Sequence, residues 1–257
     1  MLSAPAEVLN LDEICAAFAR DGFAFVGRVA NTAALAALRE ATQALMLGTA
    51  SYPEMFFQHD APTGRYEDLR YGDGWVGPSL NYRKLEGLEL DPVCWAWINN
   101  PAFKQIADRI VGPEVRLYRA VLWNKAARAG TELPWHQDDG KFWGIDRAPQ
   151  LQIWTALDEA VAASGCVEAL RGTHQRGLAS GEGGTIQSER VQSWNASPVP
   201  LEARAGDVWL IHNHVWHRSR RNRTDAPRRA ISVSYLHADT RCRRRKRAPR
   251  EFRRVFV

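Results

Sequence analysis

The sequence of 257 residues has few cysteines and no long apolar run. Its four cysteines lie far apart without a C-x-x-C pair, which argues against a zinc ribbon or a disulfide framework and fits a reducing, cytoplasmic setting. The N-terminus lacks the basic and apolar regions of a signal peptide, and no apolar run approaches the roughly 18 residues of a membrane span. We therefore expect a soluble protein, and one domain (1–257) is the usual arrangement at this length.

Acidic residues are nearly missing from the C-terminal end. Residues 240–257 contain nine Lys and Arg against Glu251 alone, a net charge of +8, whereas the whole chain carries +5 and the remainder therefore −3. Such a tail can contact nucleic acid, an anionic membrane or an acidic partner, or it can be solvated or folded back onto acidic surface. Because no zinc finger, helix-turn-helix or RNA-binding aromatic motif accompanies it, we rank nucleic acid below a small molecule as the partner. Nothing in the sequence indicates an oligomeric state.

Helical periodicity dominates the first part of the chain, and short strands follow it. Apolar spacing predicts helices over 11–22, 32–46 and 101–112, a strand over 23–29 and long loops over 50–90. Short strands separated by turns are predicted over 115–123, 133–138, 148–157, 166–170, 207–216 and 228–236. The pattern indicates a mainly β protein with flanking helices, a sandwich or jelly roll. A helical part of about 1–114 would precede a β-core of about 115–238 and a basic tail, 239–257.

The stretch WHQDDGKFWG, residues 135–144, places a histidine and two carboxylates in an apolar neighbourhood. On a strand, His136 and Asp138 project side by side from one face. An imidazole and a carboxylate give two of the three ligands of the facial triad used by non-haem Fe(II) oxygenases, and the third is a second histidine. The structural alternative is a surface turn with a hydrogen-bonded histidine. We expect the next residue, Asp139, to stabilise the turn.

Three histidines, His212, His214 and His217, are candidates for the third ligand. The first two follow Gly206 with the G-x5-H-x-H spacing of a cupin motif. That motif requires a glutamate shortly afterwards, and the chain instead continues VWHRS. The cupin interpretation therefore lacks its third ligand, and we expect His212 and His214 to make structural hydrogen bonds.

His217 fits a different arrangement. Ser219 follows two residues later, and Arg228 follows at an interval of eleven residues, at the start of a strand that carries small residues on the same face. A guanidinium binds a carboxylate through two parallel hydrogen bonds. The spacing therefore predicts an organic acid bound beside the metal, with a hydroxyl donor from Ser219.

Together these segments resemble the phytanoyl-CoA dioxygenase-like branch of the Fe(II)/2-oxoglutarate oxygenases. The similar segments are DGFAFVGRV, LYRAVLWNK, PWHQD, LQIWTALDEA, GCVEALRGTH, and GDVWLIHNHVWHRS with NRTDAPRRAIS. The resemblance implies a double-stranded β-helix (jelly roll, cupin-like) that uses Fe(II), 2-oxoglutarate and O2. It implies a dioxygenase that converts 2-oxoglutarate to succinate while oxidising its substrate.

The resemblance also implies roles for individual residues. The iron ligands would be His136, Asp138 and His217, and the cosubstrate contacts would come from Arg228, Ser219 and Asn124. Arg119 stands near where many members have glutamine. Because halogenating relatives replace the carboxylate ligand with a small residue, Asp138 implies hydroxylation, desaturation or ring closure. Substrate contacts are expected from Trp143, Trp154 and Gln137.

Three other functions fit parts of the sequence. One is a cupin-type metal enzyme that does not use 2-oxoglutarate, and another is a binding protein that keeps the fold without activity. The third is an oxygenase anchored to nucleic acid by the basic tail. We expect oxidation of a small molecule in secondary or specialised metabolism, because the short chain leaves little surface for a large acyl carrier.

Overall fold

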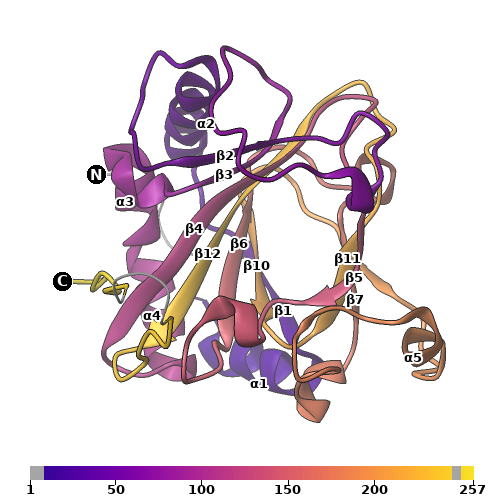
Figure 1. The fold of residues 1–257 in the computed structure, drawn as a ribbon. Helices are drawn as coiled ribbons and strands as arrows, with labels where there is room; N and C mark the ends of the chain where they lie inside the picture. Colours follow the sequence, from indigo (N-terminus) through magenta and orange to yellow (C-terminus); the bar gives the residue numbers. More distant parts are fainter. Residues whose placement is uncertain (1–8, 245–249) are drawn as a thin grey trace.

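Two antiparallel sheets face each other in the computed structural model, which describes residues 9–244 and 250–257 (Figure 1). The larger sheet has the order β1 (Phe23–Arg28), β10 (Asp207–His212), β6 (Leu151–Ala156), β12 (Arg228–His237), β4 (Val115–Lys125), β3 (Tyr82–Glu86) and β2 (Phe56–His59). The smaller sheet has the order β8 (Gly184–Thr185), β5 (Leu133–Gln137), β11 (Trp216–Ser219), β7 (Val167–Leu170) and β9 (Val199–Leu201). This is the predicted jelly roll with its flanking helices.

Helices cover the outer face of the larger sheet (Figure 1). They are α1 (Leu11–Asp21), α2 (Thr32–Leu47), α3 (Pro92–Ile98) and α4 (Pro101–Ile110), and α5 (Ser188–Gln192) lies beside the smaller sheet. Side chains of Asn10, Asn31, Asp91 and Asn100 accept hydrogen bonds from the first turns of the four covering helices. Within the described residues, every helix is too short or too polar to span a bilayer.

Apolar side chains form two main cores, and their positions determine where the cavity opens. The first core joins the helices to the outer face of the larger sheet, through residues such as Leu38, Phe103 and Ile231. The second joins the two sheets at one end, and Trp154 and Ile211 belong to it. Polar side chains line the remaining space between the sheets, so that a cavity stays open there.

The N-terminal part contains more strands than the sequence indicated. Strands β2 and β3 and helix α3 lie within or next to the stretch predicted as loops, and both strands extend the larger sheet at its β4 edge. Their short lengths and the glycine-rich residues between them conceal the alternation that identifies a strand.

The single strand predicted over 207–216 is wrong, because this segment forms two strands in different sheets. Strand β10 ends at His212, a turn follows, and β11 begins at Trp216 in the smaller sheet. The amide of Val215 donates to the carbonyl of His212, which closes the turn. The turn transfers the chain across the cavity and brings His217 opposite β5.

The C-terminal end packs onto the body. Phe252 and Val255 are buried, and the Leu117 amide donates to the Arg253 carbonyl at 2.8 Å. Arg254 lies 3.4 Å from Glu114. Residues 250–257 are therefore part of the fold at the edge of β4, as in the folded-back alternative for the basic tail. Residues 245–249, which hold three of its basic side chains, lie outside the described residues.

Candidate metal centre

His136, Asp138 and His217 lie together on the inner side of the smaller sheet. Each offers one ligand atom, and these atoms all lie within 4.8 Å of one another. The two histidines occupy directly opposite positions on β5 and β11, with ring centroids 4.1 Å apart. Asp138 follows the end of β5, and its Oδ2 is 3.6 Å from Nε2 of His217. The alternation that pairs His136 with Asp138 thus brings both to the third candidate ligand.

Each histidine is held by the carbonyl of the residue two positions before it. Nδ1 of His136 lies 2.8 Å from the Pro134 carbonyl oxygen, and Nδ1 of His217 lies 2.9 Å from that of Val215. A carbonyl accepts only, so each Nδ1 carries the proton and donates it. This leaves both Nε2 atoms free of hydrogen and able to coordinate a metal.

The carboxylate of Asp138 is fixed from two sides. Nη2 of Arg119 donates to Oδ1 at 3.2 Å, and Nε2 of Gln152 donates to Oδ2 at 2.7 Å. Gln152 in turn accepts a hydrogen bond from Ser232. The backbone of Asp138 exchanges hydrogen bonds with Asn213 in the turn between β10 and β11. Such outer contacts orient a ligand before metal arrives.

The environment of His136 and Asp138 favours the protonation states that bind metal. Burial and the neighbouring His217 lower the pKa of His136 to about 4, so this imidazole is neutral at physiological pH. Burial acts to raise the pKa of Asp138, but its close contact with His217 and the charge of Arg119 hold that pKa well below its usual range. A neutral imidazole and an ionised carboxylate are the forms that coordinate a divalent metal.

A β-bulge directs Arg119 toward the site. The register between β4 and β12 shifts at Tyr118, which has no partner between the pairs at Leu117 and Arg119. A bulge places an extra residue in one strand and re-aims its side chains. Tyr118 stacks on Trp143 with centroids 4.3 Å apart, and the Arg119 guanidinium lies 4.5 Å from the same ring. Trp143 therefore supports Arg119 and lies outside the cavity lining.

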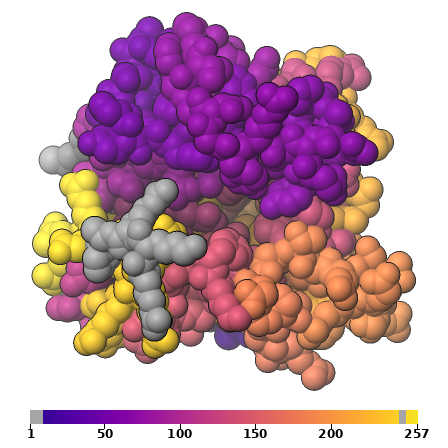
Figure 2. Space-filling view, in the orientation of Figure 1, coloured from indigo at the N-terminus to yellow at the C-terminus, as the bar shows by residue number. Residues whose placement is uncertain are grey.

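The cavity beside the metal ligands, with its opening to solvent, has a volume of about 620 Å³ and extends to the start of β12. Arg228, Ser219, Asn124 and Trp154 line it, as do the three candidate ligands. Figure 2 shows the molecular surface hollowed between the N-terminal segments and the later part of the chain. Arg228 is 3% exposed and its Nε has no hydrogen-bond partner. The structure thus brings together the ligand set and most of the predicted cosubstrate contacts.

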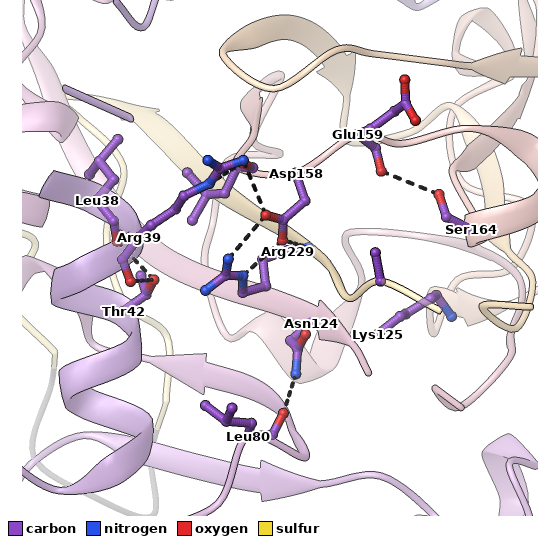
Figure 3. A network of polar contacts seen from close by, with 12 residues as sticks. Leu38, Arg39, Thr42, Leu80, Asn124, Lys125, Asp158, Glu159, Ser164 and Arg229 are labelled. Carbon is purple, nitrogen blue, oxygen red and sulfur yellow. Dashed lines mark hydrogen bonds and ion pairs between the residues drawn. The ribbon is translucent and has the colours of Figure 1, made fainter. Parts of the chain in front are cut away.

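Two predicted site residues have backbone partners instead. Asn124 donates both of its amide hydrogens to carbonyls of Leu80 and Tyr82, which fastens β4 to the start of β3 (Figure 3). Gln137 donates to the carbonyls of Gly177 and His214 and accepts from the Ala179 amide. Gln137 projects from the face of β5 opposite to its neighbours, and it therefore holds the following loops instead of lining the cavity.

His212 and His214 lie outside the ligand cluster and form structural contacts, as expected. His214 Nε2 lies 2.8 Å from Asp139 Oδ2, and His212 stacks near Phe18 and His174. Asp139 also accepts from the Gly140 amide at 2.7 Å, so its predicted role in the turn is confirmed. Burial and the nearby histidines lower the pKa of His212 to about 3.

Several residues of the cavity were not singled out from the sequence. They are Gln152, which orients Asp138, and two charged side chains at the other end, Asp60 and Lys125. The position of Lys125 could have been inferred from the sequence, because it lies two residues after Trp123 in an extended segment and therefore on the same face. That Lys125 lies opposite Arg228 depends on the partner strand and its register, which the local sequence does not determine.

The sequence and the fold are similar to those of known proteins. The family model for phytanoyl-CoA dioxygenase matches residues 18–230. Phytanoyl-CoA dioxygenase domain-containing protein 1 of Mus musculus is 30% identical over 123 residues, which are 44% of this chain and 42% of the relative. The chain spans about half the length of the curated relatives it matches.

Solved structures extend the similarity to nearly the whole chain. EctD from S. alaskensis, solved with 2-oxoglutarate and 5-hydroxyectoine, superposes with a TM-score of 0.75 at 19% identity, covering 98% of this chain and 88% of that one. SnoK, a non-heme alpha ketoglutarate dependent carbocyclase from nogalamycin biosynthesis, gives a TM-score of 0.74 at 20% identity, covering 98% and 99%. At these identities the likeness establishes the double-stranded β-helix fold.

Proposed function

The chain belongs to the phytanoyl-CoA dioxygenase family, and from this premise we propose that it is an Fe(II)- and 2-oxoglutarate-dependent oxygenase of a small molecule. The observation that carries the proposal is the cluster of His136, Asp138 and His217 within 4.8 Å, in one cavity with the buried Arg228. Two histidines and one carboxylate are the donor set of non-haem Fe(II) oxygenases.

The residues present fit both the metal and the cosubstrate. The free Nε2 atoms of His136 and His217 and the fixed carboxylate of Asp138 would hold iron. The buried guanidinium of Arg228, with its unpartnered Nε, and the hydroxyl of Ser219 would hold the distal carboxylate of 2-oxoglutarate. Bound iron would activate O2, with conversion of 2-oxoglutarate to succinate supplying electrons for oxidation of the substrate.

Asn124 would act on the cosubstrate only through β3. Its amide hydrogens are already donated, and its Oδ1, which has no partner, is an acceptor. Because 2-oxoglutarate also offers only acceptors, no direct hydrogen bond can form between them. The proposed contacts to the cosubstrate are therefore those of Arg228 and Ser219.

We propose a free small molecule from specialised metabolism as the substrate. The structural relatives support this choice, since one is described from nogalamycin biosynthesis and another with 5-hydroxyectoine. The intact carboxylate at Asp138 favours hydroxylation, desaturation or ring closure. Trp154, 4% exposed in the cavity wall, is the aromatic side chain proposed to contact the bound molecules. The packing of residues 250–257 gives no support to an anchor for nucleic acid in that part of the chain.

An anaerobic titration with Fe(II) and 2-oxoglutarate tests the proposal. We expect a metal-to-ligand charge-transfer band in the wild type that disappears in D138A and weakens in R228A, followed by succinate release in air. The control is R229A, which removes the adjacent guanidinium on the opposite face of β12. A folded, iron-loaded wild type without the band would refute the cosubstrate assignment. It would favour the alternative of a cupin-type metal enzyme that does not use 2-oxoglutarate.

A further inference from the structure

Two cationic side chains lie side by side at the end of the cavity away from the metal ligands. Arg228 and Lys125 are directly opposite each other in the register of β12 and β4, and both line the cavity. They are 3% and 5% exposed. Opposite positions on antiparallel strands place their side chains on the same face, within about 5.5 Å at Cβ. Two buried basic side chains therefore share one small space.

The hydrogen bonds of this pair are incomplete. Nη2 of Arg228 donates to the Gly165 carbonyl at 2.8 Å, and its Nε has no partner. Nζ of Lys125 donates to the Thr131 carbonyl at 2.6 Å, although an ammonium has three hydrogens to donate. Within 9–244 and 250–257, neither side chain forms an ion pair. The pair is thus able to donate several further hydrogen bonds to a ligand.

The surrounding charges do not neutralise the pair directly. Asp60 is the nearby acid of the cavity wall, but its Oδ1 accepts from the Thr131 amide at 2.7 Å and its Oδ2 has no hydrogen-bond partner. Glu132 adds a weaker attraction and Arg83 a repulsion. Burial, followed by the charge of Arg228, lowers the pKa of Lys125 well below its usual value. Arg228 keeps its charge, since burial lowers its pKa only to about 10.

We propose that Lys125 is a second cationic anchor for the distal carboxylate of 2-oxoglutarate, and that it takes up one proton from solvent when the cosubstrate binds. This inference rests on the proposed function, because it concerns the same cosubstrate. In the empty cavity the lysine faces a like charge, which disfavours its ammonium form. An incoming carboxylate supplies the missing counter-charge, which favours the ammonium and its hydrogen bonds. Binding and protonation at Lys125 are therefore coupled.

The alternative role for Lys125 is purely structural. Its Nζ fastens the carbonyl of Thr131 in the segment before β5, and this contact alone would explain a buried lysine. The two roles differ in a measurable quantity. A structural lysine would keep its protonation state when the ligand binds, whereas a lysine that binds the carboxylate would take up a proton from solvent.

Calorimetric titration of the iron-loaded protein with 2-oxoglutarate, without oxygen, separates these roles. Measurements in HEPES and in Tris, whose ionisation enthalpies differ, give the number of protons taken up; phosphate and sulfate are avoided because they would compete for the cations. We expect the wild type to take up as much as one proton, with an affinity that falls by up to about tenfold per pH unit above the pKa of the empty-site lysine. We expect K125M to bind roughly 10- to 100-fold more weakly at neutral pH, without proton uptake.

K125Q is the matched variant, because its amide can still donate to the Thr131 carbonyl but cannot titrate. We expect it to retain the thermal stability of the wild type and to lose the proton uptake. Wild-type binding without proton exchange, at an affinity that K125M and K125Q share, would overturn the inference and leave the proposed function intact. No 2-oxoglutarate binding by any form would overturn the proposed function as well. If K125M fails to fold, the proton count of the wild type decides alone.

Discussion

The two ends of the cavity differ in how completely their polar groups are paired. At the metal end, both histidines donate through Nδ1 to backbone carbonyls, and both oxygens of Asp138 accept a hydrogen bond. At the cationic end, by contrast, buried polar atoms lack partners: Nε of Arg228, Oδ2 of Asp60 and Oδ1 of Asn124.

This difference shows in which part of the site the polar groups are paired before a ligand binds. A buried polar atom without a partner is unfavourable by about 1–3 kcal/mol, so the cationic end reduces the stability of the ligand-free protein. The metal end carries little such penalty, because its orientation is maintained by internal hydrogen bonds. We therefore expect ligand binding to stabilise the cationic end. The metal end should gain less stability, because its side chains are already oriented for binding.

The largest expected effect comes from removing a ligand at the metal end. We expect D138A to weaken Fe(II) binding by well over about 100-fold, the upper range for the loss of an outer contact to a metal ligand. D139N is the matched control, since it changes the neighbouring carboxylate that contacts His214. Equilibrium dialysis against Fe(II) measures the effect. Iron affinity that is unchanged in D138A would exclude Asp138 as a ligand.

Removing the arginine should affect the cationic end alone. We expect R228A to weaken 2-oxoglutarate binding by roughly 100-fold while Fe(II) affinity stays near that of the wild type. In R229A we expect a loss of stability instead of a loss of cosubstrate affinity. Arg229 pairs with Asp158, which also contacts Arg39 of α2 (Figure 3). Its loss should reduce the free energy of unfolding by about 1 kcal/mol without affecting the cosubstrate. Denaturant melts and binding titrations on both variants test this difference between R228A and R229A. Equal 2-oxoglutarate affinities of the two variants would refute it.

The support of the metal end can be weakened without removing a ligand. We expect R119A to lower Fe(II) affinity roughly 10- to 100-fold, since Arg119 orients the carboxylate of Asp138. R119Q, whose amide can still donate, should recover part of this loss. Cosubstrate affinity of the iron-saturated protein should change less than iron affinity. An R119A variant with wild-type iron binding would mean that Gln152 alone fixes the carboxylate.

The last prediction concerns stability in acid and involves His212, which lies behind the metal end. Burial lowers the pKa of His212 to about 3, below the usual value of 6.5, so its protonation favours the unfolded chain. Its contribution to stability is complete above pH 6.5 and is lost as the pH falls toward 3, by at most about 1.4 kcal/mol per pH unit. Denaturant melts between pH 7 and 4 should show a shallower decline for H212F than for the wild type. Parallel declines would assign the acid sensitivity to other groups.

Two of the three candidate ligands at the metal end could be predicted together, because their pattern is local. The alternation of His136 and Asp138 on one strand needs no knowledge of the fold. The same alternation turns Gln137 away from the cavity, contrary to the expected substrate contact, and its three hydrogen bonds are to backbone groups. The bulge that directs Arg119, and the stacking of Trp143 beneath it, depend on strand pairing between distant segments.

The cationic end could be predicted only in part for the same reason. Arg228 was identified by its interval from His217, whereas Lys125 gains its role from the register between β4 and β12. The turn between β10 and β11 was also missed. Its residues, His212 to Val215, continue an apolar and aromatic stretch that reads as one strand, and only the presence of a second sheet separates them.

The position of the two histidines opposite each other has a consequence for how the chain folds. His136 and His217 come from strands widely separated in sequence, so their pairing closes a long loop and is entropically expensive. Each ring contacts a carbonyl two residues before it in the chain, so this contact does not depend on the partner strand. Pairing of β5 with β11 and assembly of the metal site are therefore the same event. Iron present during refolding should act as a cross-link that slows the separation of these strands, and their amides should be the ones whose hydrogen exchange it suppresses most.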